Sequence, residues 1–283
     1  MLKTTFTRTA AVMAAAIVPA TAAYASDVIA GADALAGIAS DDRPLGDGKD
    51  RFSGGVLPSV QIDGGGFLVQ ADGMLFDHRK DTSYGGALHV GVKTGGGGFF
   101  GIYGSISTLR RLGGLETTRI GGEFAQTRGD FTVTAVLGHE NTERGLAYVT
   151  TTATDDVYYA YGKRGHFFSF ADIKYQPSDK FRLSLGHRYT GGRNAAAAGV
   201  GVGLGTNASV IGEARIGGGD YKAGFVGLRI AFGGADDGSS TLLDNRLIED
   251  LFSESNTRRT LLDPLPPPGG GEGCGSCGGY CET

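Results

Sequence analysis

Apolar and polar residues alternate along many short segments in the middle of the chain. From Phe131 to Leu137 all odd-numbered positions are apolar, and threonines occupy two of the positions between them. From Phe181 to Tyr189 the same period of two separates apolar residues from two arginines. Such a period places alternate side chains on opposite faces of a β-strand. It predicts strands near 58–75, 86–94, 99–108, 116–127, 131–140, 166–176, 181–190, 196–204, 208–217 and 221–233.

Every formal charge in the strand middles falls on the polar face, which two architectures would explain. A soluble sandwich turns the apolar face inward, whereas an outer-membrane barrel turns it toward lipid. Short Gly/Asp/Ser turns alternate with longer connections, and strands of about 9 to 12 residues match a tilted crossing of a bilayer. Tyrosines near strand ends favour the barrel, whereas the absence of tryptophan counts against it.

These features predict an all-β membrane protein, an up-and-down antiparallel β-barrel of about ten strands, with eight or twelve as alternatives. Segments 146–154 and 157–162 raise the number to twelve if they cross the membrane. As an extracellular hairpin they leave it at ten.

The two ends of the chain differ from this pattern. Residues 1–25 have the basic, apolar and small-residue zones of a cleaved signal peptide, so we expect export to the outer membrane. Residues 26–56 are expected to form a polar linker, with an alanine-rich stretch suited to a short helix. The barrel is assigned to 57–233. Residues 234–283 are expected to form a flexible periplasmic tail with a short helix, suggested by Leu243, Leu247 and Leu251, and a Cys/Gly-rich end.

Composition and charge narrow the function classes. The chain has 51 glycines among 283 residues, and after residue 25 no apolar run is long enough for a spanning helix. Removing residues 1–25 takes two of the 26 basic residues and none of the 30 acidic ones. The remaining chain has a net charge of −6, so a nucleic-acid partner is not expected.

Four segments, 60–64, 100–105, 171–179 and 221–233, resemble a group of uncharacterised proteobacterial outer-membrane β-barrel proteins described as porin-like. The resemblance covers about residues 57–233. It implies a location and a shape without a reaction, with outer-membrane lipid and the barrel-assembly machinery as partners. The last strand also resembles the assembly signal of such barrels, through Gly227, Ile230 and Phe232.

Placing the strand charges inside a barrel predicts a cation-rich lumen. An open lumen of this kind would favour anionic solutes, whereas ion pairs and other side chains would fill a closed one. The closed form is slightly favoured. The residues expected to line the lumen are Asp72, Lys93, Arg119, Glu123, Asp172, Lys174, Arg182, Arg188, Glu213, Arg215 and Arg229.

Motifs for enzymatic chemistry are not found, and neither an enzyme activity nor a cofactor is predicted. The five histidines are scattered and are interpreted as surface or interfacial residues. Cys274, Cys277 and Cys281 form a C-x-x-C-x-x-x-C pattern, suited to one disulfide plus a free thiol or to a metal.

The sequence therefore predicts a porin-like passive channel or a structural barrel. The alternatives are an interaction or adhesion barrel without transport and an accessory protein that binds metals or thiols through its tail. The oligomeric state stays open.

Overall fold

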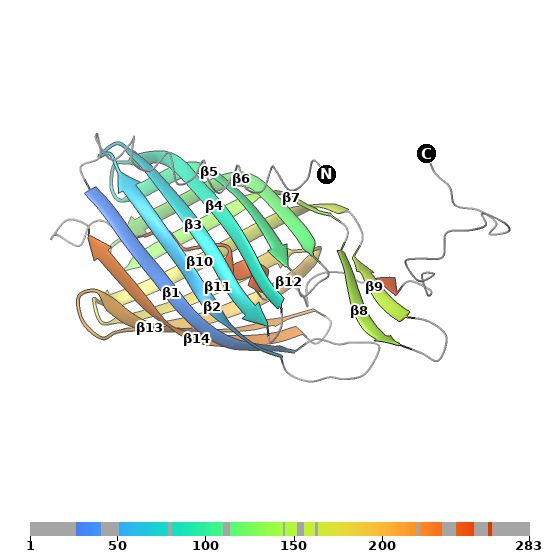
Figure 1. Ribbon diagram of the computed structural model, residues 1–283. Helices are drawn as coiled ribbons and strands as arrows, with labels where there is room; N and C mark the ends of the chain where they lie inside the picture. Colours follow the sequence, from blue (N-terminus) through green and yellow to red (C-terminus); the bar gives the residue numbers. More distant parts are fainter. Residues whose placement is uncertain are drawn as a thin grey trace.

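The computed structural model describes residues 27–40, 51–78, 81–109, 114–143, 145–151, 156–161, 164–218, 221–233, 242–251 and 260–261. Twelve antiparallel strands close into a single barrel (Figure 1). Around the barrel the order is β1, β14, β13, β12, β11, β10, β7, β6, β5, β4, β3 and β2, and β2 pairs with β1 to complete the circle.

All twelve barrel strands have 10 to 15 residues, long enough to cross a bilayer at a tilt. The barrel strands are β1 (Asp27–Ser40), β2 (Arg51–Asp63), β3 (Phe67–His78), β4 (Asp81–Thr94), β5 (Gly98–Leu109), β6 (Leu115–Arg128), β7 (Phe131–Thr142), β10 (Arg164–Ser178), β11 (Phe181–Thr190), β12 (Arg193–Gly203), β13 (Ala208–Gly217) and β14 (Tyr221–Gly233).

The barrel has twelve strands instead of the expected ten, and both additional strands lie before residue 79. The alanine-rich stretch expected as a helix within a linker is strand β1. Its alternation is hard to recognise because alanine and glycine occupy many positions on both faces. The expected strand 58–75 is two strands, joined by a turn in which the Asp63 carboxylate accepts a hydrogen bond from Gly65 N over 2.9 Å. Gly65 has a positive φ of 80°, which glycine adopts without strain.

A separate small sheet lies beyond one end of the barrel. It contains β8 (Gly145–Thr151), β9 (Asp156–Tyr161) and β15 (Thr260–Leu261), with β9 in the centre. The hairpin of β8 and β9 therefore does not add to the barrel strands. It follows β7 in the chain, strand β8 lies close to β6, and Figure 1 shows the sheet to the right of the barrel.

The outer face of the barrel wall is apolar and the inner face is polar, the reverse of the arrangement in a soluble protein. Apolar side chains on the outer face are exposed, including Leu185 (69%), Ile216 (65%) and Ile120 (64%). Inward-facing Arg119 and Arg188 are only 2% exposed. An apolar surface around the whole barrel is unfavourable in water and suits a lipid environment.

The two ends of the barrel differ in their connections. At one end the strands are joined by turns of two to four residues, and both Asp27 and Gly233 lie there, since Asp27 pairs with Asp63 and Gly233 with Ile29. We call this the terminal end. The opposite end, called the loop end, carries the longest connections, 41–50 and 143–163.

Candidate functional site

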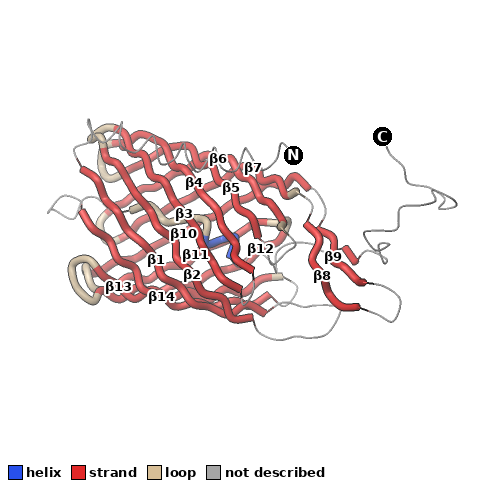
Figure 2. The backbone as a smooth tube through the Cα atoms, in the orientation of Figure 1, coloured by secondary structure: helices blue, strands red, loops and turns tan. Residues whose placement is uncertain are grey.

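The barrel interior contains a segment of the chain that follows the last strand. Residues 242–251, which we call the plug segment, lie among the inward-facing side chains and include the one-turn helix α2 (Ile248–Leu251). Figure 2 shows this helix inside the barrel. Asn245 stabilises the turn before the helix, because its side-chain oxygen accepts a hydrogen bond from Leu247 N over 3.1 Å.

The first residues of the plug segment are held by polar groups of β2, β3 and β10. Gln70 of β3 makes two hydrogen bonds to the backbone of Leu243, at 2.8 and 3.0 Å. Asn245 donates to the Gly73 carbonyl over 3.1 Å and to Ser59 Oγ over 3.4 Å. Asp244 forms an ion pair with Lys174 of β10. Because these contacts satisfy the backbone as well as side chains, they fix the position of a segment with little secondary structure.

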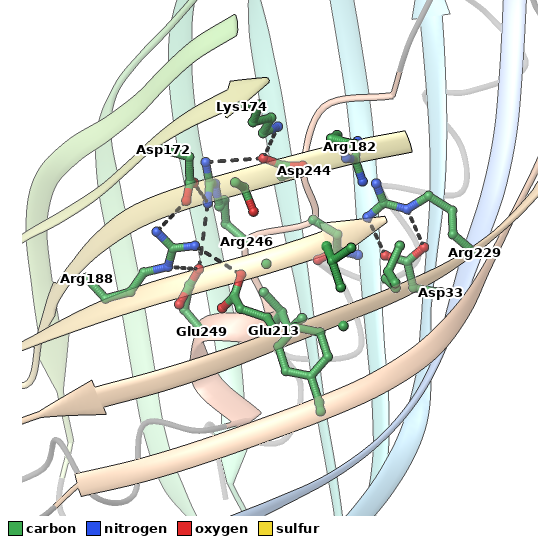
Figure 3. A pocket seen from close by; sticks show the side chains of 18 residues that line it. Asp33, Asp172, Lys174, Arg182, Arg188, Glu213, Arg229, Asp244, Arg246 and Glu249 are labelled. Carbon is green, nitrogen blue, oxygen red and sulfur yellow. Dashed lines mark hydrogen bonds and ion pairs between the residues drawn. The ribbon is translucent and has the colours of Figure 1, made fainter. Parts of the chain in front are cut away.

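The middle of the plug segment is held by buried ion pairs (Figure 3). Arg246 donates to Asp172 of β10 over 2.8 Å and to Thr134 Oγ1 over 3.1 Å. Glu249 lies between two wall arginines, with Arg188 Nε at 2.9 Å and Arg215 Nη1 at 2.7 Å. These side chains are nearly inaccessible to solvent, so their charges are tolerable only because they neutralise one another.

The last described contacts of the plug segment are with β6. Arg119 Nη1 lies 2.6 Å from Asp250 Oδ1, and Arg119 Nε lies 2.9 Å from Glu140 Oε2. Thr190 donates to the same Glu140 oxygen over 2.7 Å and accepts a hydrogen bond from Arg119. The guanidinium also lies 5.6 Å from the centre of the Phe170 ring, within range of a cation–π contact.

An apolar contact complements the charges. Leu247 has no exposed surface and packs in a cluster with side chains from the interior of the barrel wall. Burying such a side chain contributes about 1.5–3 kcal/mol. Other members of the cluster are Leu35, Leu57, Met74, Phe76, Leu109, Leu115, Ala195, Ile211, Tyr221 and Ala223.

A second buried polar network connects to the plug segment through β3. His89 of β4 has Glu123 Oε2 2.7 Å from Nδ1 and Asp72 Oδ2 2.9 Å from Nε2. Asp72 also accepts a hydrogen bond from Gln70, which binds the backbone of Leu243. The interpretation of every histidine as a surface residue was therefore wrong for His89, which is fully buried. Its partners lie on other strands, so no local motif indicates them.

The structure places the eleven expected lumen residues on the inward face, together with anions that the sequence analysis did not include. Lys93 pairs with Asp63, Arg229 pairs with Asp33 through two hydrogen bonds of 2.7 Å, and Arg119 pairs with Glu140. With Asp33, Asp63 and Glu140 added, seven wall anions face seven wall cations. The plug segment adds Asp244, Glu249 and Asp250 against Arg246. The expected excess of cations is therefore absent among the described lumen residues.

A small cavity remains between the plug segment and the part of the wall formed by β10 to β14 and β1. Its volume is about 80 Å³, and charged groups such as Asp33, Lys174, Arg182 and Asp244 line it. Pockets for small-molecule ligands usually measure about 300–1,000 Å³. The cavity therefore has space for a few water molecules beside the plug segment, and much less than a solute needs.

The remaining candidate residues have different positions. On β14, Phe232 points outward with 59% of its surface exposed, and Gly227 and Ile230 lie in register with Leu35 and Ala32 of β1. Cys274, Cys277, Cys281 and the expected signal peptide lie outside the described residues.

Within the described ranges no group of three or more His, Cys, Asp or Glu side chains has the arrangement of a metal site. Over the same ranges the helices are too short or too polar to cross a membrane.

No model of a protein family matches the chain, and no curated protein matches it. Several solved structures resemble it. The KdgM porin is 12% identical with a TM-score of 0.47, over 71% of this chain and 99% of its own. An outer membrane channel from Pseudomonas putida F1 is 7% identical with a TM-score of 0.48, over 75% of this chain and 98% of its own. The translocator domain of autotransporter NalP from Neisseria meningitidis is 15% identical with a TM-score of 0.35, over 80% of this chain and 97% of its own.

The geometry of this chain defines its class by itself. A closed antiparallel barrel with an apolar outer surface and a charged interior is the architecture of a porin-like outer-membrane β-barrel. Within that class, a segment of its own chain in the lumen distinguishes this barrel from one with an open interior.

Proposed function

We propose that this protein is a porin-like outer-membrane channel that is held closed by its own plug segment. The observation that carries the proposal is the set of contacts between the plug segment and the wall. Ion pairs connect it to β6, β10, β11 and β13, and hydrogen bonds connect it to β2, β3 and β7. A plug attached to so many strands occupies the path that a solute would take.

The chemistry of the contacts supports a closure that can open. Each charged group of the plug segment faces a wall charge, and both partners would be hydrated if the segment left the lumen. Loss of the ion pairs would then be offset by solvation, as in an exposed salt bridge. The vacated lumen would be lined by cations and anions in equal number, so passage of small hydrophilic solutes is expected, with weak selectivity for charge.

A structural barrel without transport is the second candidate. The burial of Arg119 and Asp250, which are 1% and 0% exposed, supports a plug segment that stays in place. Removing one partner of such a buried pair is costly because the other charge is left uncompensated. The two candidates therefore differ in whether the plug segment leaves the lumen of the intact barrel.

Single-channel recording of the full chain in planar bilayers separates the candidates. We expect the wild type to be closed for most of the time, with brief openings. The variant Glu249→Gln removes one of the two carboxylates that Arg188 and Arg215 share, the other being Glu213. Its open probability should rise about tenfold, equivalent to ~1.4 kcal/mol. Asp179→Asn, in an exposed turn at the terminal end, removes the same charge and should behave as the wild type. A Glu249→Gln barrel that folds but never conducts would favour the structural barrel.

A further inference from the structure

The order of contacts shows that the plug segment is directed along the barrel axis. Leu243 binds Gln70, which lies four residues from the turn 64–66 at the terminal end. Asp250 binds Arg119, which lies four residues from the start of β6 at the loop end. Between them, Arg246 contacts Asp172 in the middle of β10. The chain therefore advances from the terminal half of the lumen toward the loop half.

The parts of the chain on either side of the plug segment lie at opposite ends of the barrel. Gly233, the last residue of β14, pairs with Ile29 at the terminal end. Thr260 and Leu261 form β15 and pair with Ala160 and Tyr159 of β9. Strand β9 belongs to the connection 143–163 between β7 and β10, which is at the loop end (Figure 1).

The lengths of chain available are sufficient for a complete passage through the barrel. Eight residues lie between Gly233 and Leu242, and eight lie between Leu251 and Thr260. Each such stretch spans at most about 30 Å when extended. The hydrocarbon core of a bilayer is also about 30 Å thick, so two stretches of this length joined by the plug segment can cross it.

We infer that the chain threads through its own barrel and that its C-terminal end leaves at the loop end. In outer-membrane barrels the short turns face the periplasm and the longer loops face the outside. The protein would then display residues 262–283, with Cys274, Cys277 and Cys281, at the cell surface. This placement differs from the expected periplasmic tail, and it goes beyond the proposed channel because the chain itself would pass from one side of the membrane to the other.

The charges of the plug segment have a specific part in this arrangement. Asp244, Glu249 and Asp250 pair with wall cations on β10, β11, β13 and β6, so the segment is attached to opposite parts of the wall. Such attachment anchors the displayed end without a covalent bond. The lumen offers apolar as well as charged side chains, so the apolar Leu247 can pack against the wall although charged residues lie on either side of it in the sequence.

Thiol labelling of intact cells tests the inference, because all three cysteines of the chain lie between residues 274 and 281. Cells expressing the full chain are treated with a membrane-impermeant reductant and then with a membrane-impermeant maleimide. The signal is divided by that of the same protein labelled after denaturation. We expect intact cells to give at least about half of the denatured signal.

Two single-cysteine variants calibrate the sides of the membrane, in a background in which Cys274, Cys277 and Cys281 are replaced by serine. Gly95→Cys lies in a turn at the terminal end, and Gly218→Cys lies at the loop end; both positions have open space for a side chain and no positive φ. A tail labelled on the same side as Gly218→Cys supports threading. A tail labelled only on the side of Gly95→Cys overturns it. Conduction is not measured here, so a failure of the proposed channel would leave this result unchanged.

Discussion

Arg119 of β6 and Asp250 of the plug segment form a buried ion pair at 2.6 Å, although 131 residues separate them in the sequence. The pair joins a strand of the wall to a segment that follows the complete barrel. Arg119 also holds Glu140 of β7, so one guanidinium connects two strands and the plug segment. Closure of the lumen is therefore coupled to the internal packing of the wall.

Replacing Leu247 by alanine should weaken the closed state without changing any charge. A buried leucine truncated to alanine costs about 2–5 kcal/mol in a core, and less where water can refill the space. We expect the open probability in planar bilayers to rise by at least about tenfold. Leu243→Ala is the matched control, because Leu243 is only half-buried and is held through its backbone. Equal effects of the two substitutions would show that the apolar cluster does not hold the plug segment.

The closed state should be lost in acid through Asp244. The Asp244 carboxylate pairs with Lys174 of β10 and lies 3.4 Å from Arg246 Nη2. The ionised carboxylate therefore attaches the plug segment to the wall, and its protonation in acid removes this ion pair. An aspartate carboxyl ordinarily titrates near pH 4. Openings should therefore become more frequent below about pH 4.

The variant Asp244→Asn identifies the group responsible for that pH dependence. It should open more often than the wild type at neutral pH and should respond less to acid. If Asp244→Asn retained the full acid response, another carboxylate would control opening.

Placing a charge on the lipid face should destabilise the barrel. Leu185 lies in the middle of β11 and is 69% exposed on the outer face. Leu185→Arg should lower the free energy of unfolding by ~2–4 kcal/mol if the residue lies near the bilayer midplane. The measurement is reversible denaturant unfolding in lipid vesicles. Asp179→Arg, in a turn outside the hydrocarbon region, should change the stability by much less, and an equal loss would contradict the assigned outer face.

The last strand should have a special role in insertion. Phe232 ends the alternating pattern of β14 and points outward, as does Phe100 on β5, with 61% of its surface exposed. Both side chains offer similar apolar area to lipid. If Phe232 belongs to an assembly signal, Phe232→Ala should reduce the amount of folded barrel in outer membranes more than Phe100→Ala does. Quantitative gel analysis of unheated membrane samples provides the comparison, and equal yields would speak against the signal.

The sequence predicted the faces of the strands well and the path of the chain poorly. Alternation placed Arg119, Arg188 and Arg215 on the polar face, because side-chain direction depends only on local backbone geometry. It missed β1, since alanine and glycine leave little contrast between faces. It also interpreted Leu243, Leu247 and Leu251 as one face of a tail helix. Within the described residues the helix α2 covers Ile248–Leu251, so Leu243 and Leu247 lie before it, and Leu247 is buried against the wall.

The ion pairs of the lumen could not be predicted from local patterns. Asp33 and its partner Arg229 are 196 residues apart, and the barrel brings them together only when β1 pairs with β14. His89 of β4 likewise obtains its two carboxylates from other strands, Asp72 from the neighbouring β3 and Glu123 from β6, which lies beyond β5. A signal for the plug segment was nonetheless present, because Asp244, Arg246, Glu249 and Asp250 place four charges among leucines directly after the last strand.

In the proposed channel the plug segment occupies the lumen and closes it. The most direct test is a reversible disulfide between Asn245 of the plug segment and Ser59 of β2, whose polar atoms lie 3.4 Å apart. The variant Ser59→Cys/Asn245→Cys, in the background with serine at 274, 277 and 281, is recorded in planar bilayers before and after reduction. We predict cross-linking in the folded barrel, no conduction when oxidised and openings after reduction, with neither single-cysteine variant responding to oxidant. An oxidised, cross-linked barrel that conducts as well as the reduced one would show that the plug segment does not close the lumen.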